Sequence, residues 1–237
     1  METVLPLSAD AQTDSITQKE ALPERLRSGA MRVVLLLAAA AVFVGTAEAP
    51  PRFVGAVSKV TAADLPYSWR PGCPVSPSQL RRLTVSHWDL AGRRRVGSIV
   101  VRASAARAVI SVFRKLYAAH FPIRRLRLVE AYKGSDDASM AADNTSGFNC
   151  RFVSGTRRWS QHAYGLAIDI NPVENPFVHG GRVEPPAGHR YLDRSRARPG
   201  MVVSGDVVVR AFAAIGWSWG GHWASSKDYQ HFSAKGT

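Results

Sequence analysis

Two short segments of the chain combine the side chains that proteins use to bind a catalytic metal ion. The first reads SQHAYGLAID and contains His162 and Asp169, and the second reads DYQH and ends in His231. Two imidazoles and one carboxylate bind zinc and leave its fourth tetrahedral position open, whereas structural zinc sites close all four. A further carboxylate, Asp228, lies three residues before His231 and can take a proton from water as a general base. The set predicts metal-assisted hydrolysis with one Zn²⁺ ion.

The same residues also have simpler interpretations, which the sequence leaves open. Asp169 lies between Ile168 and Ile170, so we expect it to be buried, and a buried carboxylate needs a partner. An arginine or backbone donors would satisfy it as well as a metal ion. Likewise, His231 can be a core histidine, with Asp228 exposed in a turn.

The local sequence indicates how the backbone would present these groups. Gly165 allows the chain to turn back between His162 and a strand that we expect over residues 166–170. Three residues apart on one strand, Asp228 and His231 would face opposite sides, so a bend must separate them. We expect Asp228 at a loop edge and His231 at the start of a final strand.

The rest of the pattern favours an α+β fold, a single domain with a central, mainly antiparallel sheet and flanking helices. Residues 134–147 are polar and predict a long functional or mobile loop. The regular elements that we expect are a hairpin over 83–88 and 97–101, a helix from a cap at Ser104 to before Pro122, a strand over 127–132 and a helix capped by Asp206.

The N-terminal residues have the features of a targeting segment. Arginines precede an apolar run over 33–44, and Ala-Glu-Ala at 47–49 suits signal peptidase. The alternative is an uncleaved membrane anchor, and translation starts at either Met1 or Met31. The expected organisation is an extension with signal peptide or anchor over 1–49, a linker over 50–66 and a catalytic domain over 67–237. We therefore expect a secreted or cell-envelope protein.

The chain is strongly basic. Removing residues 1–49 takes away four of the 31 basic and six of the 18 acidic side chains, which leaves 27 and 12 and a net charge of +15. Such a surface attracts polyanions. Because the sequence has no recognised nucleic-acid-binding motif, we expect no nucleic acid and instead anionic cell-wall polymers as partners of the basic surface. The protein is expected to be a monomer.

The two cysteines, Cys73 and Cys150, both follow the targeting segment. An even pair in an oxidising compartment is compatible with a disulfide, and two buried thiols are the alternative. The sequence does not decide between them, because it does not give the distance between the two residues.

The pattern SxHxxGxAxD, which begins at Ser160, and the pattern DxxH, which ends at His231, resemble a family of zinc peptidases that cut peptidoglycan stem peptides. Its members are D-alanyl-D-alanine carboxypeptidases of the vancomycin-resistance type (VanY-like) and the related L-alanyl-D-glutamate endopeptidases. The resemblance extends from about Gly72 to Phe232 and includes the segments FNCR, DINP and GWSWGG. It implies a Hedgehog/DD-peptidase-like fold.

Carried over by position, the resemblance implies that His162, Asp169 and His231 hold the zinc ion and that Asp228 is the general base. Several members of the family have a glutamate as base, and aspartate is shorter by one methylene. The substrate implied is the peptidoglycan stem peptide, cut by metal-activated water.

The resemblance also implies roles for two further residues. Arg151 would be the cation beside the scissile carbonyl, where it stabilises the developing oxyanion. Ser160 would orient a ligand or the substrate, although a serine that only forms the turn is the alternative. His222 replaces the acidic or amide residue of many relatives, and we expect it to be a solvent-facing loop histidine.

These expectations leave more than one function open. The first is an exported D-Ala-D-Ala carboxypeptidase, and the second is an L-Ala-D-Glu-type endopeptidase on the same scaffold. A third is a non-catalytic cell-wall-binding module that keeps zinc for stability. Asp228 argues against this module, because a purely structural site needs no base.

Overall fold

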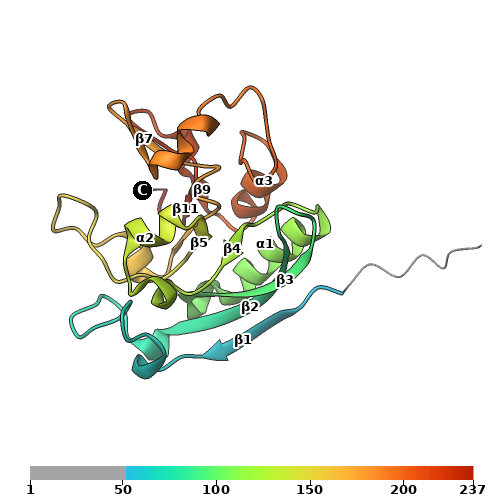
Figure 1. The fold of residues 1–237 in the computed structure, drawn as a ribbon. Coiled ribbons are helices and arrows are strands. Elements are labelled where there is room, and N and C mark those ends of the chain that lie inside the picture. Colours follow the sequence, from blue (N-terminus) through green and yellow to red (C-terminus); the bar gives the residue numbers. More distant parts are fainter. Residues whose placement is uncertain (1–51, 237) are drawn as a thin grey trace, which may run out of the picture. The chain divides into compact units, whose positions relative to one another are not determined.

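The two longest strands form the hairpin that the sequence predicts. In the computed structural model, which describes residues 52–236, β2 (Leu80–Trp88) pairs antiparallel with β3 (Arg94–Arg102) (Figure 1). β1 (Gly55–Lys59) pairs with the other edge of β2 and completes a three-stranded sheet. The prediction of a linker over 50–66 is therefore wrong. All five residues of β1 are exposed, so the strand has no apolar run and only its backbone pairing reveals it.

A single long helix covers this sheet. After a 3-10 turn, η3 (Ala103–Ala105), α1 runs over Ala106–Ala118, so the helix begins two residues beyond Ser104. Apolar residues spaced three and four apart along it are buried, namely Val109, Ile110, Phe113, Leu116 and Tyr117, and the helix packs against β2 and α3 (Val207–Ala213). Asp206 caps α3 as predicted, because its Oδ1 accepts a hydrogen bond from Val209 N at 2.9 Å.

The remaining strands form several small sheets instead of one central sheet. The mainly antiparallel arrangement is confirmed, since all three three-stranded sheets are antiparallel and only one two-stranded pair is parallel. The strands outside the hairpin sheet are β6 (Ala167–Asp169), β11 (His231–Ser233) and β9 (Ser218–Trp219) in one sheet, β10 (Lys227–Asp228), β7 (Phe177–His179) and β8 (Arg182–Glu184) in another, and the parallel pair β4 (Arg125–Leu126) and β5 (Asn144–Thr145).

Two predictions in the middle of the chain are wrong. The strand expected over 127–132 is a 3-10 helix, η4 (Val129–Tyr132), and the loop expected over 134–147 contains both α2 (Asp136–Ala141) and β5. Ser135 caps α2, because its hydroxyl accepts from Ala138 N at 3.1 Å. The other 3-10 helices are η1 (Ala62–Asp64), η2 (Pro77–Gln79), η5 (Gln161–Tyr164), η6 (Pro186–Tyr191) and η7 (Gly220–His222).

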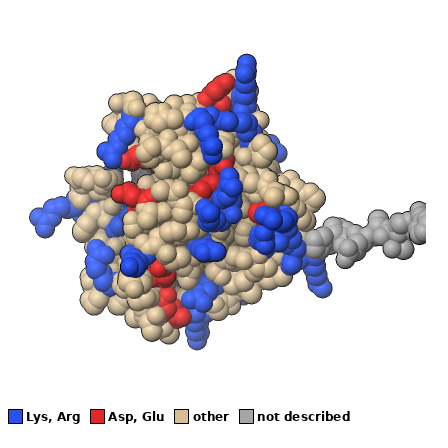
Figure 2. Space-filling model, in the orientation of Figure 1, with Lys and Arg blue, Asp and Glu red and all other residues tan. Residues whose placement is uncertain are grey.

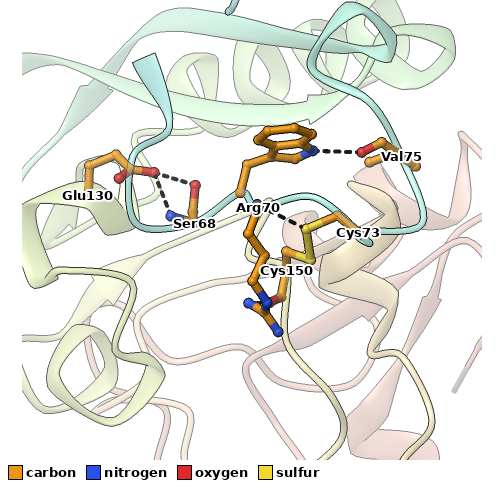
Figure 3. The surroundings of a disulfide bond; sticks show 7 residues. Ser68, Arg70, Cys73, Val75, Glu130 and Cys150 are labelled. Atoms are coloured by element: carbon orange, nitrogen blue, oxygen red, sulfur yellow. Dashed lines mark hydrogen bonds between the residues drawn. A yellow bond between two sulfur atoms is a disulfide. The ribbon is translucent and has the colours of Figure 1, made fainter. Parts of the chain in front are cut away.

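Cys73 and Cys150 form a disulfide, with Cα atoms 5.9 Å apart across 77 positions of sequence (Figure 3). Arg70 Nη1 donates to the carbonyl of Cys150 at 2.8 Å beside it. In the same loop, the amide of Ser68 donates to the carboxylate of Glu130 at 3.2 Å. The loop before β2 is thereby fastened to the segment that leads into Arg151.

Residues 52–236 belong to one compact unit with a buried apolar core. Among residues 52–236, no helix has both the length and the apolar character that crossing a membrane requires. The signal peptide or anchor expected over 1–49 lies outside the described residues.

Candidate metal centre

His162, Asp169 and His231 come together in one buried cluster. His162 Nε2 lies 3.1 Å from Asp169 Oδ2, His231 Nδ1 lies 3.0 Å from Asp169 Oδ1, and the two imidazole nitrogens are 3.3 Å apart. No member of the cluster is more than 7% exposed. The three residues that the sequence singles out as metal ligands therefore converge on one point.

The spacing of these atoms fits a small metal ion. A tetrahedral zinc ion with bonds of about 2.0–2.1 Å holds its ligand atoms roughly 3.3 Å apart. The three separations in the cluster are within a few tenths of an ångström of that value, and one ligand atom of each residue lies within 4.8 Å of the others. Two neutral imidazoles and a carboxylate are also the donor set that zinc accepts while keeping a position open.

Strand pairing fixes two of the three ligands. His231 lies directly opposite Asp169 in the antiparallel pairing of β11 with β6. The other edge of Asp169 is held by Ser146, because each of the two backbone amides donates to the other residue's carbonyl, at 2.9 and 3.0 Å. The carboxylate and the imidazole therefore sit on a rigid framework of main-chain hydrogen bonds.

Two asparagines fix the chain just after β6. Asn171 has φ of 44° and its side-chain amide donates to the carbonyl of Pro122 at 2.8 Å. The Asn175 amide donates to the carbonyl of Ile170 at 3.0 Å, and its oxygen accepts from Val202 N at 2.6 Å. Both side chains are fully buried, so the DINP and NP segments of the sequence hold the end of the Asp169 strand in place.

A tight turn positions His162. Ser160 is the N-cap of η5, and its hydroxyl accepts from His162 N at 3.3 Å. The turn ends at Gly165 with φ of +66°, where a Cβ atom would lie 2.6 Å from Arg102 N. Only glycine fits this position. Ser160 therefore acts on the turn that carries His162.

A hydrogen bond from the far side of the ring selects the tautomer of His162. Its Nδ1 lies 2.7 Å from the carbonyl oxygen of Gly147, which can only accept, so Nδ1 carries a proton and Nε2 is the ring nitrogen that faces Asp169. Gly147 is closely packed, since a Cβ there would lie 2.4 Å from Val100 O. The carbonyl that orients His162 is therefore itself fixed in position.

The cluster keeps Asp169 charged despite its burial. Burial by itself would raise the pKa of this carboxyl, but the charge and hydrogen bond of His162, with further contributions from His231, hold its pKa well below the usual range. A buried carboxylate that stays ionised between two imidazoles is a site for a cation, which would take the place of the protons that the imidazoles now share with it.

Asp228 reaches the neighbourhood of the cluster from a different sheet. It lies on β10 opposite Phe177 of β7, so a bend separates it from His231 as the sequence predicts. Burial raises the pKa of Asp228 to about 7, His231 opposes this shift and the negative charge of Asp169 adds to it. Its Oδ1 is buried and has no hydrogen-bond partner among the described residues. Gly220 packs against it, since a Cβ there would lie 2.6 Å from Asp228 O.

Arg151 is held by an acidic residue that the sequence analysis missed. Its Nη2 lies 2.8 Å from Asp136 Oδ2 at the start of α2. Burial raises the pKa of Asp136, Arg151 opposes this rise, and Asp169 and His162 also influence it, which places the ion pair near the cluster. Arg151 Nε is buried and has no partner among the described residues, so the guanidinium keeps an unused donor.

The sequence contains a signal for Asp136 that a loop interpretation hides. Ser135 followed by Asp136 and Asp137 is a serine cap with two acidic residues in the first helical turn. This signal predicts a helix start, although it does not predict that Asp136 pairs with Arg151, which comes 15 positions later in the sequence.

A cavity of about 460 Å³ lies between α2 and the β7–β8 hairpin. One wall is α2, with Asp137 and Met140, and the other is the β7–β8 hairpin with Arg182 and Glu184. The same two elements carry neighbours of the cluster, since α2 holds the partner of Arg151 and β7 pairs with the strand of Asp228.

The tryptophans near the C-terminus are mainly packing residues. Trp217 and Trp219 belong to the apolar core, and Trp219 Nε1 donates to Tyr229 O at 2.8 Å. The ring of Trp223 lies 5.5 Å from that of His231. His222 is exposed, as expected of a loop histidine.

Comparison with known families agrees with this cluster. A family model described as D-alanyl-D-alanine carboxypeptidase matches residues 154–234, the part of the chain that carries His162, Asp169, Asp228 and His231. The match confirms the resemblance that the sequence patterns indicate, and its description indicates a peptidase. A comparison with curated proteins gave no match, and neither did one with solved structures. Arg151 lies before the matched segment.

Proposed function

We propose that this chain is an exported zinc metallopeptidase that hydrolyses peptide bonds in peptidoglycan stem peptides, of the D-Ala-D-Ala carboxypeptidase type. The observation that carries the proposal is the geometry of His162, Asp169 and His231, whose nitrogen and oxygen atoms lie 3.0–3.3 Å apart within the segment that matches the carboxypeptidase family. The single ion would be held by His162 Nε2, by the Asp169 carboxylate and by His231 Nδ1.

The bound ion would supply Lewis acidity toward the scissile carbonyl and toward water. Asp228 would act as the general base. Its Oδ1 is buried, has no hydrogen-bond partner among the described residues and can accept a proton from the attacking water. The same carboxyl group then delivers that proton to the leaving amine. One residue thus acts as base and then as acid.

Arg151 would stabilise negative charge on the carbonyl oxygen. Its ion pair with Asp136 uses one end of the guanidinium, while Nε remains without a partner. Asp136 acts through Arg151 and is therefore a positioning residue. Ser160 contributes in the same indirect way, through the turn that presents His162.

The cavity between α2 and the β7–β8 hairpin is the proposed binding region for the stem peptide. Its lining includes charged groups of both signs, Asp137 and the ion pair of Arg182 with Glu184. A peptide with carboxylates and an amino group along its length meets complementary charges there.

The wider setting belongs to the same proposal. A Hedgehog/DD-peptidase-like fold, export through the N-terminal segment, and a secreted or envelope-associated monomer are consistent with a cell-wall substrate. The net charge of +13 supports attraction to anionic cell-wall polymers.

The test is digestion of purified peptidoglycan with the full chain, followed by mass spectrometry of the products. The experiment includes a chelator, zinc add-back, Asp228→Asn and Asp193→Asn. Asp193 is an exposed residue whose carboxylate only bonds Ser195 and Arg196, so it is a matched control for the loss of one carboxylate. We expect zinc-dependent loss of the terminal alanine with the wild type and Asp193→Asn but not with Asp228→Asn.

The products also separate the alternatives. A new N-terminal D-glutamate would identify the L-Ala-D-Glu endopeptidase. A zinc-loaded chain that binds peptidoglycan and releases no product would contradict the peptidase and leave the non-catalytic wall-binding module.

A further inference from the structure

A second cavity, of about 520 Å³, lies at the turn of the β2–β3 hairpin beside β4. None of the residues that line it belongs to the candidate metal centre. Five of its lining residues are arginines: Arg93, Arg95, Arg124, Arg125 and Arg127. Five guanidinium groups around one cavity create a positive potential that favours the binding of an anion.

Internal ion pairs neutralise only part of this charge. Asp89 is the one acidic residue of the lining, and its Oδ2 accepts from the Nε atoms of Arg93 and Arg95, each at 3.0 Å. These contacts involve the Nε atom of each guanidinium, so the two terminal Nη atoms can donate hydrogen bonds to a ligand. Outside the lining, Arg124 pairs with Asp143 at 3.3 Å and with Glu174 at 3.7 Å, and Arg125 donates to the carbonyl of Ala142. The side chain of Arg127 has no hydrogen bond or ion pair within residues 52–236 and is exposed. The cavity therefore retains a strong positive potential.

His87 is a second, independent observation that indicates a ligand in this cavity. The residue lies opposite Arg95 in the hairpin, lines the cavity and is only 5% exposed. Its Nδ1 is buried and has no partner among the described residues. A buried polar atom without a partner is costly, and an anion in the cavity would satisfy it by accepting a hydrogen bond from the ring.

The chemistry of the lining selects the kind of anion. Guanidinium groups bind phosphate through two parallel hydrogen bonds, and several separate groups around one open cavity suit a ligand with repeated charges. Figure 2 shows Lys and Arg side chains spread over one face of the protein, with fewer Asp and Glu side chains among them.

We propose that the cavity lined by Arg93, Arg95 and Arg127 is a binding site for a soluble phosphodiester-linked polymer, with adjacent phosphates on adjacent guanidinium groups. The site is separate from the proposed active site and requires no hydrolysis. It would hold the protein on a phosphate-bearing polymer, independently of the peptide that the metal centre contacts.

The test is calorimetric titration of the full chain with a synthetic glycerol phosphate hexamer, with hexaglutamate as a carboxylate ligand of similar charge. The variants are Arg127→Gln, which breaks no internal contact, and Arg95→Gln/Arg127→Gln. The matched control is Lys59→Gln/Arg107→Gln, which removes two exposed positive charges from the opposite end of the sheet and from the start of α1. A second readout is the imidazole NMR signal of His87, for which burial lowers the pKa to about 4.

We expect the hexamer to bind more tightly than hexaglutamate and to raise the pKa of His87. Arg95→Gln/Arg127→Gln should weaken binding by at least roughly tenfold, because each charge-assisted contact contributes on the order of one decade in affinity. The control variant should bind nearly as well as the wild type. Equal losses in the two double variants would overturn the proposal, since binding would then follow net charge alone. An unchanged His87 signal would also overturn it.

Discussion

Arg151 Nη2 lies 2.8 Å from Asp136 Oδ2, in an ion pair that joins the residue after the disulfide to the first turn of α2. The pair sets the direction of a guanidinium that keeps a buried, unpartnered nitrogen. It also connects the two segments that border the metal cluster on this side. The position of Arg151 therefore depends on a residue that itself has no role in holding a metal ion.

Replacing Asp136 should reduce catalysis without removing the metal. In Asp136→Asn the guanidinium loses its charged partner and leaves its orientation, so we expect kcat to fall by roughly tenfold or more, with a smaller change in KM. Steady-state hydrolysis of a stem pentapeptide measures both constants. Asp136→Glu should recover part of the loss, because it restores the charge.

Two results would count against this role of Asp136. One is an Asp136→Asn variant with wild-type kcat. The other is a variant that loses bound zinc together with its activity, because Asp136 would then act on the metal cluster and not through Arg151.

Adding one methyl group at Gly220 should displace the proposed base. A Cβ there would lie 2.6 Å from Asp228 O and 2.8 Å from Asp228 Cβ, so the strand that carries Asp228 must move. We expect Gly220→Ala to lower kcat by roughly 10- to 100-fold while zinc content stays that of the wild type. Activity and zinc content are measured on the same preparation.

Gly147→Ala is the contrasting variant. It adds the same methyl group against Val100 O, 2.4 Å away, and shifts the carbonyl that orients His162. We expect weaker zinc binding here, by roughly 10- to 100-fold, as is usual when the partner of a ligating histidine is disturbed. If Gly220→Ala loses zinc and Gly147→Ala does not, the assignment of base and ligand is wrong.

The disulfide should contribute to stability. It closes a separation of 77 positions, for which the entropy of the unfolded chain predicts a contribution of roughly 4–5 kcal/mol. We expect Cys73→Ser/Cys150→Ser to lower the free energy of unfolding by that amount in urea titrations. A reductant should destabilise the wild type and leave the double variant unchanged. Identical midpoints for the two proteins would show that the bond adds nothing.

A buried carboxyl group should make stability depend on pH. Glu174 is fully buried, and burial, together with the hydrogen bond and charge of Asp143, raises its pKa to about 8 from an ordinary value of 4.5. Between these values the folded protein binds a proton that the unfolded chain has lost. The contribution of Glu174 to the free energy of unfolding is therefore fully present below about pH 4.5 and is lost as the pH rises to about 8. The slope is about 1.4 kcal/mol per pH unit at most.

Glu174→Gln should remove this slope, because the amide does not titrate and retains an acceptor for the Tyr191 hydroxyl. The free energy of unfolding is measured from pH 5 to pH 9 in both proteins. A slope that is the same in wild type and variant would assign the pH dependence to other groups.

The candidate metal ligands were predictable because their signal is local and chemical. His162 and Asp169 share one turn and strand, and the glycine between them has the left-handed conformation that the turn needs. The α1 helix was equally predictable, since its apolar spacing matches its buried face. In both cases nearby residues carry the information.

Predictions failed where long-range contacts decide the structure. β1 has an exposed side-chain pattern and exists only because its backbone pairs with β2. Asp136 acquires its role from Arg151, and His87 from a cavity lined by residues of two distant segments. No periodicity within a short window reports such partners.

The most direct test of the metal centre is the zinc content of the chain after dialysis against zinc-free buffer, measured by plasma mass spectrometry. The wild type and Asp193→Asn should each retain about one zinc ion per chain, and Asp169→Ala should retain almost none, because it removes the carboxylate between the two imidazoles. Equal zinc content in the wild type and Asp169→Ala, or no zinc in the wild type, would contradict the metal centre.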